Sequence, residues 1–191
     1  MGPRVPLTIV IGTIQGWPEI RSNVASFRAA AEAVGGELIV ADGSGRPAPH
    51  PGETGPHETW LSEPGLSVFQ LRRLAYQRAQ GEIVAITEDH CFVGEDWGRL
   101  ILQAHAEHPE ASVIGGAVEN AATGSLIDWA SFFVVQAAFM PPLAAGPARR
   151  LAGAVNVSYK RRALEALADH EGMGAMDVLH QAMLQERGEA L

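Results

Sequence analysis

The first half of the chain alternates short apolar runs with segments of helical periodicity. The runs cover residues 7–11 (LTIVI), 37–41 (ELIVA) and 82–87 (EIVAIT). They are rich in β-branched residues and lack alternating polar positions, which is typical of strands covered on both faces. Strands separated by helices form βαβ units with right-handed crossovers. The pattern therefore predicts an α/β fold with a mostly parallel sheet and helices on both faces.

Three helices are predicted between and after these strands. The first begins at Pro18 and ends before Gly35, because apolar residues recur at helical spacing between a favoured first-turn residue and a helix stop. The second covers residues 67–80. The third follows Asp96, the expected N-cap, and ends before Pro109.

Residues 43–66 differ in kind, because they hold five of the twelve prolines and almost no periodicity. They predict a long loop, which is uncommon in a compact chain and usually has a function or moves. His50 and His57 lie in this loop, and we give them no role.

The second half is less regular. Residues 111–119 (ASVIGGAVE) predict a fourth strand that completes a third βαβ link, and residues 126–140 an apolar helical stretch. Aromatic residues at helical spacing are mostly core, and core is the interpretation we favour for this stretch, with Trp129, Phe132, Phe133, Phe139 and Met140. The alternative is that these residues line a hydrophobic ligand pocket or contact a membrane surface. The stretch falls short of the roughly 20 apolar residues that cross a bilayer.

Composition narrows the class of protein. The 191 residues include 22 acidic and 14 basic side chains, for a net charge of −8, which argues against broad nucleic-acid binding. The single cysteine, Cys91, excludes an intrachain disulfide and favours a reducing, cytoplasmic setting. The N-terminal apolar run is too short for a secretory signal. One domain is expected.

Polar groups follow three of the predicted strands directly. They are Gly12-Thr13, Asp42-Gly43-Ser44 and Glu88-Asp89-His90. Because ligands of open parallel sheets bind outside the carboxyl ends of the strands, these groups predict one binding edge. Carboxylates beside an imidazole can ligate a divalent cation such as Mn²⁺ through mixed oxygen and nitrogen donors. We therefore expect a metal at Glu88 and His90.

The order and spacing of these segments resemble glycosyltransferase family 2, the nucleotide-diphosphosugar transferases with the GT-A fold. The resemblance runs from Leu7 to Gly188 and rests on the series LTIVIGT, ELIVADGS, AQGEIVAITEDHC, SVIGGAV and GAVNVSYKRRAL. It implies that residues 1–120 form a nucleotide-sugar-binding half and residues 121–191 an acceptor-side half. This family normally continues beyond the point where the present chain stops, so the acceptor-side half is expected to be compact or truncated.

The resemblance also implies roles for individual residues. Asp42 would contact the base of the nucleotide, and residues 88–90 would stand for the family's DXD motif. In that motif Glu88 and Asp89 contact the sugar nucleotide, and His90 ligates Mn²⁺ or Mg²⁺. Thr13 and Arg72 would lie near the nucleotide. The acceptor-side asparagine would be Asn156, although a buried asparagine that satisfies backbone groups is an equal alternative.

Three positions depart from the family pattern. Ala41-Asp42 replaces the usual double aspartate, His90 stands where aspartate is usual, and Met176-Asp177 replaces a Glu-Asp pair. Asp177 keeps the family's spacing to Gly188 and would be the catalytic base. The lost acidic neighbours belong to the site and leave the elements of the fold unchanged.

A basic stretch holds five cations within fourteen positions, namely Arg149, Arg150, Lys160, Arg161 and Arg162. It could neutralise a diphosphate or an acceptor phosphate, because arginine binds phosphate through a bidentate fork. The alternative is a solvated surface, which we favour for Arg162.

The sequence thus predicts an inverting transferase that moves a sugar from a UDP-sugar to the hydroxyl of a glycan, lipid or small-molecule acceptor. It would act in the cytoplasm or at the cytoplasmic face of a membrane. A nucleotide-sugar-binding or assembly subunit without activity is the rival reading. A sugar-1-phosphate nucleotidyltransferase ranks lower, because the segment GTIQGWPEIR lacks the lysine expected after the first strand.

Overall fold

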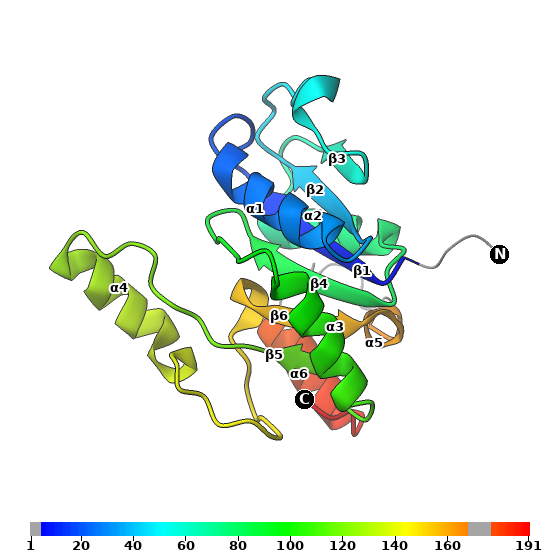
Figure 1. Cartoon of the computed structure of the whole chain (residues 1–191), viewed down its shortest axis with the longest axis vertical. Coiled ribbons are helices and arrows are strands. Elements are labelled where there is room, and N and C mark those ends of the chain that lie inside the picture. The colour runs from blue at the N-terminus through cyan, green and yellow to red at the C-terminus, as the bar shows by residue number, and fades with distance from the viewer. Residues whose placement is uncertain (1–4, 168–176) are drawn as a thin grey trace.

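The computed structural model describes residues 5–167 and 177–191. Within this part of the chain, the strands form one six-stranded sheet in the order β3-β2-β1-β4-β6-β5 (Figure 1). The strands are β1 (Leu7–Thr13), β2 (Glu37–Asp42), β3 (Glu58–Ser62), β4 (Ile83–Glu88), β5 (Val113–Gly115) and β6 (Val157–Lys160). The helices are α1 (Arg21–Glu32), α2 (Val68–Arg78), α3 (Trp97–Glu107), α4 (Leu126–Gln136), α5 (Arg161–Glu165) and α6 (Asp177–Glu186), with 3-10 turns η1 (Pro51–Glu53), η2 (Ala137–Phe139) and η3 (Gly153–Val155).

The sheet is mostly parallel, as the sequence predicts. Strands β3, β2, β1 and β4 pair in parallel, whereas β6 is antiparallel to both β4 and β5. Strand β5 therefore runs in the same direction as β4, with the one reversed strand between them. Because the chain leaves β1 toward β2 and β3 and returns to β4 on the other side of β1, the strand order reverses between β1 and β4. Such a reversal is where open α/β sheets bind ligands.

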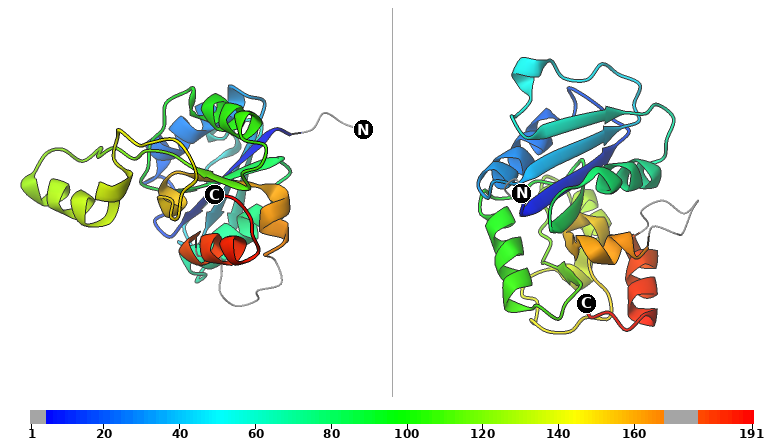
Figure 2. Two further views of the ribbon diagram at one scale, coloured as in Figure 1. Left: turned by 90° about the horizontal axis from the view of Figure 1, so that it is seen from below. Right: turned by 90° about the vertical axis from the view of Figure 1, so that its right-hand side faces the viewer.

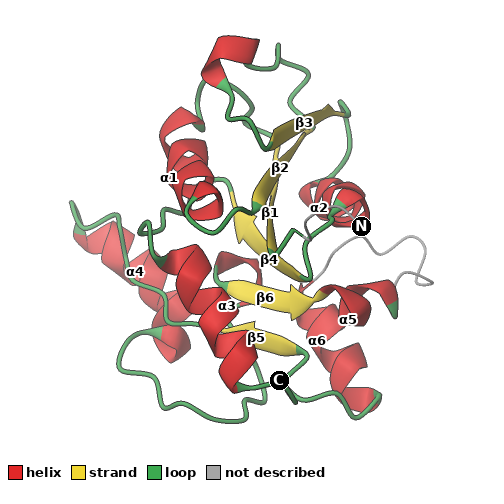
Figure 3. Cartoon of the chain, turned by 45° about the vertical axis from the view of Figure 1, so that its right-hand side comes forward, coloured by secondary structure: helices red, strands yellow, loops and turns green. Residues whose placement is uncertain are grey.

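Helices cover both faces of the sheet (Figure 3), and the alternation of side chains along each strand assigns residues to them. In β1, Leu7, Ile9 and Ile11 pack in one apolar cluster with Phe27 of α1 and Ile101 of α3. Val10 points into the other cluster, which holds residues from α2, α5 and α6. Each fully buried aliphatic side chain contributes roughly 1.5–3 kcal/mol.

The helix predictions hold for α1, α2 and α3, with one correction in detail. Helix α2 starts at a capping box in which the Gln70 backbone N–H donates to Ser67 Oγ and the Ser67 backbone N–H donates to Gln70 Oε1. The predicted N-cap of α3 is wrong as a side-chain cap, because Asp96 makes no capping hydrogen bond. Its carboxylate instead lies 3.4 Å from Arg99, one turn into the helix.

The prediction of a loop throughout residues 43–66 is wrong, because this segment contains β3, which pairs with β2. Strand β3 lies at the edge of the sheet and has only two apolar residues in its centre, so its pattern is weak. It is held by Glu58, whose buried carboxylate lies 2.5 Å from Arg28 Nε of α1 and accepts from Trp60 Nε1 at 2.6 Å. A tertiary ion pair therefore stabilises a strand that local periodicity does not reveal.

The predicted fourth strand is also corrected. Strand β5 covers only Val113–Gly115, and its neighbour is β6 rather than β4. Strand β6 lies in the segment read as a basic stretch, although Val157 and Tyr159 face one apolar cluster and Ser158 faces the other side. Lys160 ends this strand, and further cations precede and follow it, so the charge of the segment hid an alternating strand pattern.

Helix α4 is not part of the core, contrary to the favoured reading of Trp129, Phe132 and Phe133, whereas Phe139 of η2 is buried as that reading expects. It lies apart from the body of the molecule in both Figure 1 and the left view of Figure 2. None of its residues is buried, and Leu126 and Val134 are 88% and 86% exposed. Trp129, Phe132 and Phe133 contact one another instead of the sheet. In the described part of the chain, no helix is both long and apolar enough to cross a membrane.

A buried histidine joins α3 to β6. His105 Nε2 lies 3.0 Å from Ser158 Oγ, and that hydroxyl also lies 3.3 Å from the carbonyl oxygen of Ile114. Burial, helped by the positive charge of Lys160 and opposed by the contact with Ser158, lowers the pKa of His105 to about 4. The folded protein therefore holds this imidazole neutral where an unfolded chain would protonate it.

We expect His105 to make the fold sensitive to acid. Between its ordinary pKa near 6.5 and about 4, the unfolded chain binds a proton that the folded chain does not. Stability is therefore complete above pH 6.5 and falls toward pH 4, by on the order of 3 kcal/mol from this residue. Urea unfolding at pH 7 and pH 4.5 should show a smaller acid loss for His105→Gln than for the parent. An equal loss in both proteins would contradict this assignment.

Candidate active site

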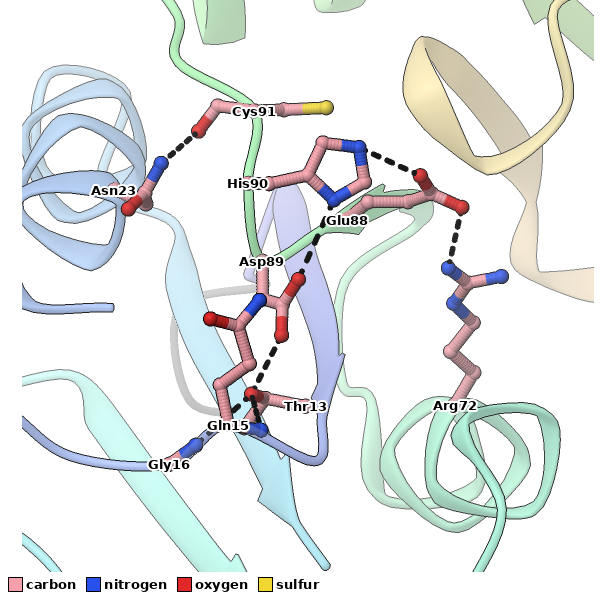
Figure 4. Close-up of polar contacts among 9 residues, drawn as sticks. All are labelled: Thr13, Gln15, Gly16, Asn23, Arg72, Glu88, Asp89, His90 and Cys91. Carbon is pink, nitrogen blue, oxygen red and sulfur yellow. Dashed lines mark hydrogen bonds and ion pairs between the residues drawn. The ribbon is translucent and has the colours of Figure 1, made fainter. Parts of the chain in front are cut away.

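The polar groups at the strand ends meet at one edge of the sheet, as predicted. Thr13 ends β1, Asp42 ends β2 and Glu88 ends β4. In the strand register Thr13 is opposite Asp42, and Gly12 is opposite Glu88. The carboxyl edge, as we call these strand ends and the residues directly after them, therefore gathers side chains from three strands at the point where the strand order reverses. Figure 4 shows the part of this edge that β1 and β4 supply.

Thr13 is fully buried and works as a positioning residue. Its hydroxyl donates to Asp89 Oδ2 at 2.7 Å and accepts from the backbone N–H groups of Gln15 and Gly16 at 3.1 and 3.2 Å. The same hydroxyl thus holds the loop after β1 and orients a carboxylate after β4. With these bonds in place, the Thr13 hydroxyl is engaged within the protein, and its predicted contact with a nucleotide stays a prediction.

Asp42 presents a buried carboxylate at the end of β2. Its side chain is 3% exposed, and Oδ1 accepts from the Ser44 backbone N–H at 2.7 Å. Oδ2 takes part in no hydrogen bond found within residues 5–167 and 177–191. The loop after β1 passes close by at Gly16, whose φ is +72°, and a Cβ there would lie 3.1 Å from Oδ2 and 2.2 Å from Ser44 Oγ. Only glycine combines this backbone conformation with this close approach.

A chain of alternating charges crosses the carboxyl edge. The buried Arg72 of α2 donates from Nη2 to Glu88 Oε1 at 2.8 Å, and Glu88 Oε2 lies 3.2 Å from His90 Nε2. The other ring nitrogen, Nδ1, lies 3.4 Å from Asp89 Oδ1. Figure 4 shows the imidazole between the two carboxylates. Arg72 reaches this position past Gly12, where an added Cβ would lie 3.0 Å from Arg72 Cγ.

These contacts shift the protonation of the central groups. The hydrogen bond to Asp89 raises the pKa of His90, against the opposing effect of burial and with help from the charges of Glu88 and Asp89. Burial raises the pKa of Asp89, but hydrogen bonds from His90 and Thr13 outweigh it, so its net pKa is lowered. The contact between His90 and Asp89 thus favours a protonated His90 imidazole beside an ionised Asp89 carboxylate.

The predicted metal ligands have suitable chemistry, but their side chains are not arranged around a common point where a metal ion could bind. Across the described residues, no group of three or more His, Cys, Asp and Glu side chains is placed to hold a metal ion. His90 points its nitrogens at the carboxylates that would share a cation with it. Its side chain is 65% exposed, so rotation out of this position needs no repacking of the core. Glu88, Asp89 and a rotated, neutral His90 are the residues that could hold Mn²⁺ or Mg²⁺.

Asn156 lies at the same edge, and both ends of its side-chain amide form hydrogen bonds within the protein. Its Oδ1 accepts from Trp97 Nε1 at 3.2 Å, and its Nδ2 donates to the carbonyl oxygen of Ala117 at 2.9 Å. It thereby ties α3 to the segment after β5. This arrangement matches the structural alternative for Asn156, and an acceptor-side role stays a prediction.

The remaining predicted residues lie elsewhere or are only partly described. Helix α6 begins at Asp177, whereas Met176 lies outside the described residues. Lys160 ends β6, which is antiparallel, so Lys160, Arg161 and Arg162 lie at the opposite edge of the sheet from Asp42. The basic stretch therefore does not supply one continuous phosphate site at the carboxyl edge.

One supporting residue was missed by sequence reasoning. Asn23 of α1 is buried and donates from Nδ2 to the carbonyl oxygen of Cys91 at 3.1 Å, which fixes the turn that carries His90 (Figure 4). A polar residue beside Val24 and Phe27, on the apolar face of a predicted helix, was the available signal.

Comparison with known proteins identifies the fold. No protein-family model matches the sequence, and no curated protein matches it. Among solved structures, S. aureus TarS 1-349 matches 97% of this chain with a TM-score of 0.69 at 12% identity. The mannosyltransferase PcManGT from Pyrobaculum calidifontis, solved with GDP-Man and Mn²⁺, matches 99% with a TM-score of 0.62 at 17% identity. TarS 1-349 with UDP-GlcNAc matches 93% with a TM-score of 0.59 at 11% identity.

The chain therefore has the fold of the GT-A glycosyltransferases over nearly its whole length. This confirms the predicted fold class. The chain spans about half the length of these structures, covering 56%, 54% and 52% of them.

Proposed function

We propose that this protein binds a UDP-sugar at the carboxyl edge and transfers the sugar, with inversion, to the hydroxyl of an acceptor. The observation that carries the proposal is the buried Asp42 carboxylate beside the Glu88, Asp89 and His90 chain, at the strand-order reversal of a GT-A fold. Structures of the same fold were solved with UDP-GlcNAc and with GDP-Man. Residues 1–120 would serve the nucleotide sugar and residues 121–191 the acceptor.

Asp42 would select the base. A carboxylate accepts hydrogen bonds only, so it pairs with the imide N–H of uracil, whereas cytosine offers an acceptor at that position. Oδ2 is the atom available, because Oδ1 already accepts from Ser44. This chemistry favours UDP over CDP.

Arg72, Glu88, Asp89 and His90 would surround the diphosphate. A divalent cation bound there would stabilise the negative charge that grows on the departing diphosphate. Glu88 and Asp89 would hold it, and His90 would join them as a neutral ligand. Arg72 keeps Glu88 in place and adds a fixed positive charge to the edge.

Asp177 would act as the general base. It would take the proton of the acceptor hydroxyl, whose oxygen then bonds to the anomeric carbon as the bond to the diphosphate oxygen breaks. Such a single displacement inverts the anomeric configuration. Asp177 begins α6 and keeps its spacing to Gly188, and these two facts support the assignment.

Helix α4 supports a peripheral membrane association and a lipid-linked acceptor. A helix that is apolar on all sides is normally buried in a protein or a membrane. Asp128 is the one charged residue of α4, and the segment that carries the helix starts after β5 and returns at β6, both at the carboxyl edge. We therefore propose that α4 enters a lipid surface beside the active site, on the cytoplasmic face. The alternative is a binding or assembly subunit without turnover.

The proposal is tested first by nucleotide binding. Asp42→Ala should weaken UDP binding in the presence of Mn²⁺ by about 10- to 100-fold, because it removes one charged hydrogen bond, and should abolish the preference for UDP over CDP. Isothermal titration measures both. Glu63→Ala is the matched control, because Glu63 is an exposed carboxylate next to the same edge. Unchanged UDP affinity in Asp42→Ala would refute the base assignment.

Transfer itself separates the enzyme from a binding subunit. Asp177→Asn should fold and bind UDP as the parent does, because asparagine has nearly the size and shape of aspartate, but its side chain cannot accept a proton as a carboxylate does. Sugar transfer should fall by about 10² to 10⁴. A variant that transfers at the parent's rate would leave Asp177 with a structural role. A parent without turnover on any UDP-sugar would favour the binding subunit.

Vesicle sedimentation tests the role of α4. The parent should pellet with phosphatidylcholine vesicles, and the double variant Ile127→Lys with Val134→Lys should bind at least about tenfold less, because two apolar side chains no longer enter the bilayer. Leu100→Lys, an exposed leucine on α3, is the control and should bind as the parent does. Equal binding by all three proteins, or none by the parent, would contradict the proposal.

A further inference from the structure

A second site of chemical interest lies at the amino edge of the sheet, away from Asp42 and Glu88. A hollow of about 520 Å³ opens there between the end of α3, the start of β4 and the end of β6. Strand β4 runs from Ile83, which lines the hollow, to Glu88 at the carboxyl edge. Ile83 and Glu88 are five residue steps apart along the strand, which corresponds to about 17 Å. The hollow is therefore distinct from the nucleotide site proposed above.

The charged lining of the hollow contains three cations and two carboxylates, namely Lys160, Arg161, Arg162, Glu82 and Glu165. Arg161 Nε lies 3.9 Å from Glu165 Oε1. Lys160 donates from Nζ to the carbonyl oxygen of Pro109, which is uncharged. Arg162 makes no ion pair with any described residue. Two neighbouring positive charges thus border the hollow without an acidic partner in contact.

The positive charges of Lys160 and Arg162 affect the pKa of Lys160 and of the neighbouring His105. Burial and the positive charge of Arg162 lower the pKa of Lys160, against the acidic groups of Glu110 and Glu189. His105 also lines the hollow, and its buried Nδ1 has no hydrogen-bond partner within the described part of the chain. Lys160 and burial both disfavour its charged form. An anion in the hollow would offset the repulsion between Lys160 and Arg162, and it would favour the charged forms of Lys160 and His105.

We infer that this hollow binds the phosphate group of a small molecule, with Lys160 and Arg162 as its principal contacts. Arginine matches a phosphate through its two-pronged fork, and lysine adds a point charge. The rest of the lining is largely apolar, and the volume lies within the usual range for small-molecule sites. The ligand is thus an organic phosphate or inorganic phosphate.

NMR of the His105 imidazole reports binding at this place alone. Inorganic phosphate and ribose 5-phosphate, titrated separately at pH 7.5, should each shift the His105 signal saturably below about 10 mM. Saturation should also raise the pKa of His105, because the anion offsets the charge of Lys160. Tighter binding of ribose 5-phosphate would assign the apolar lining to the organic part, and equal binding would assign recognition to the phosphate alone.

Two variants and one control test whether Lys160 and Arg162 contact the bound phosphate. Arg162→Gln and Lys160→Gln should each weaken binding by about tenfold or more, because each removes a charged hydrogen bond. Arg162 is exposed, so its variant is expected to fold. Arg99→Gln removes an exposed cation of α3 outside the hollow and should leave binding unchanged. Absence of a saturable His105 shift in the parent, or equal weakening by Arg99→Gln, would overturn the inference.

Discussion

The ion pair between Arg72 and Glu88 sets the geometry of the carboxyl edge. Arg72 is buried beneath the edge, and a buried cation without a counter-charge is strongly destabilising. Glu88 supplies that charge at 2.8 Å and so joins α2 to β4. Its second oxygen then meets His90, His90 meets Asp89, and Asp89 receives the hydroxyl of Thr13 at 2.7 Å. One buried guanidinium thereby begins a series of contacts that joins α2 to β4, to the turn after β4 and to β1, and the absence of a side chain at Gly12 leaves room for it.

Much of the fold could be predicted because the central strands of the sheet are continuous apolar runs in the sequence. The continuous runs that became β1, β2 and β4 are buried on both faces, so hydrophobicity alone marks them. Strands β3 and β6 escaped prediction, because Glu58 and Ser158 are polar residues whose partners, Arg28 and His105, come from helices distant in sequence. Helix α4 was assigned to the core because its composition is that of a core helix. The apolar composition of such a helix indicates that it packs against another surface, but it does not indicate whether that surface is the protein core or something else.

In the candidate site too, some features could be predicted from the sequence and others could not. That Thr13, Asp42 and Glu88 would share one edge followed from the topology of parallel strands. Which groups they contact did not follow from the topology, because Arg72 and Asn23 reach the edge from α2 and α1 through tertiary packing. The family resemblance alone placed Arg72 near this edge, and nothing in the sequence paired it with Glu88. The sequence also indicated a cation near His90, whereas the structure places the imidazole itself between the two carboxylates. A protonated histidine and a divalent cation satisfy the same pair of negative charges, and residue spacing cannot distinguish them.

The central claim is that the carboxyl edge receives a uridine nucleotide. A crystal structure of the protein with UDP and Mn²⁺ tests it most directly. The account predicts the uracil imide N–H within hydrogen-bond distance of Asp42 Oδ2. It also predicts the diphosphate beside Glu88 and Asp89, with His90 turned away from its ion pairs and toward the metal. A nucleotide bound away from Asp42, or a diphosphate that leaves the His90 pairing with Glu88 and Asp89 intact, would contradict it.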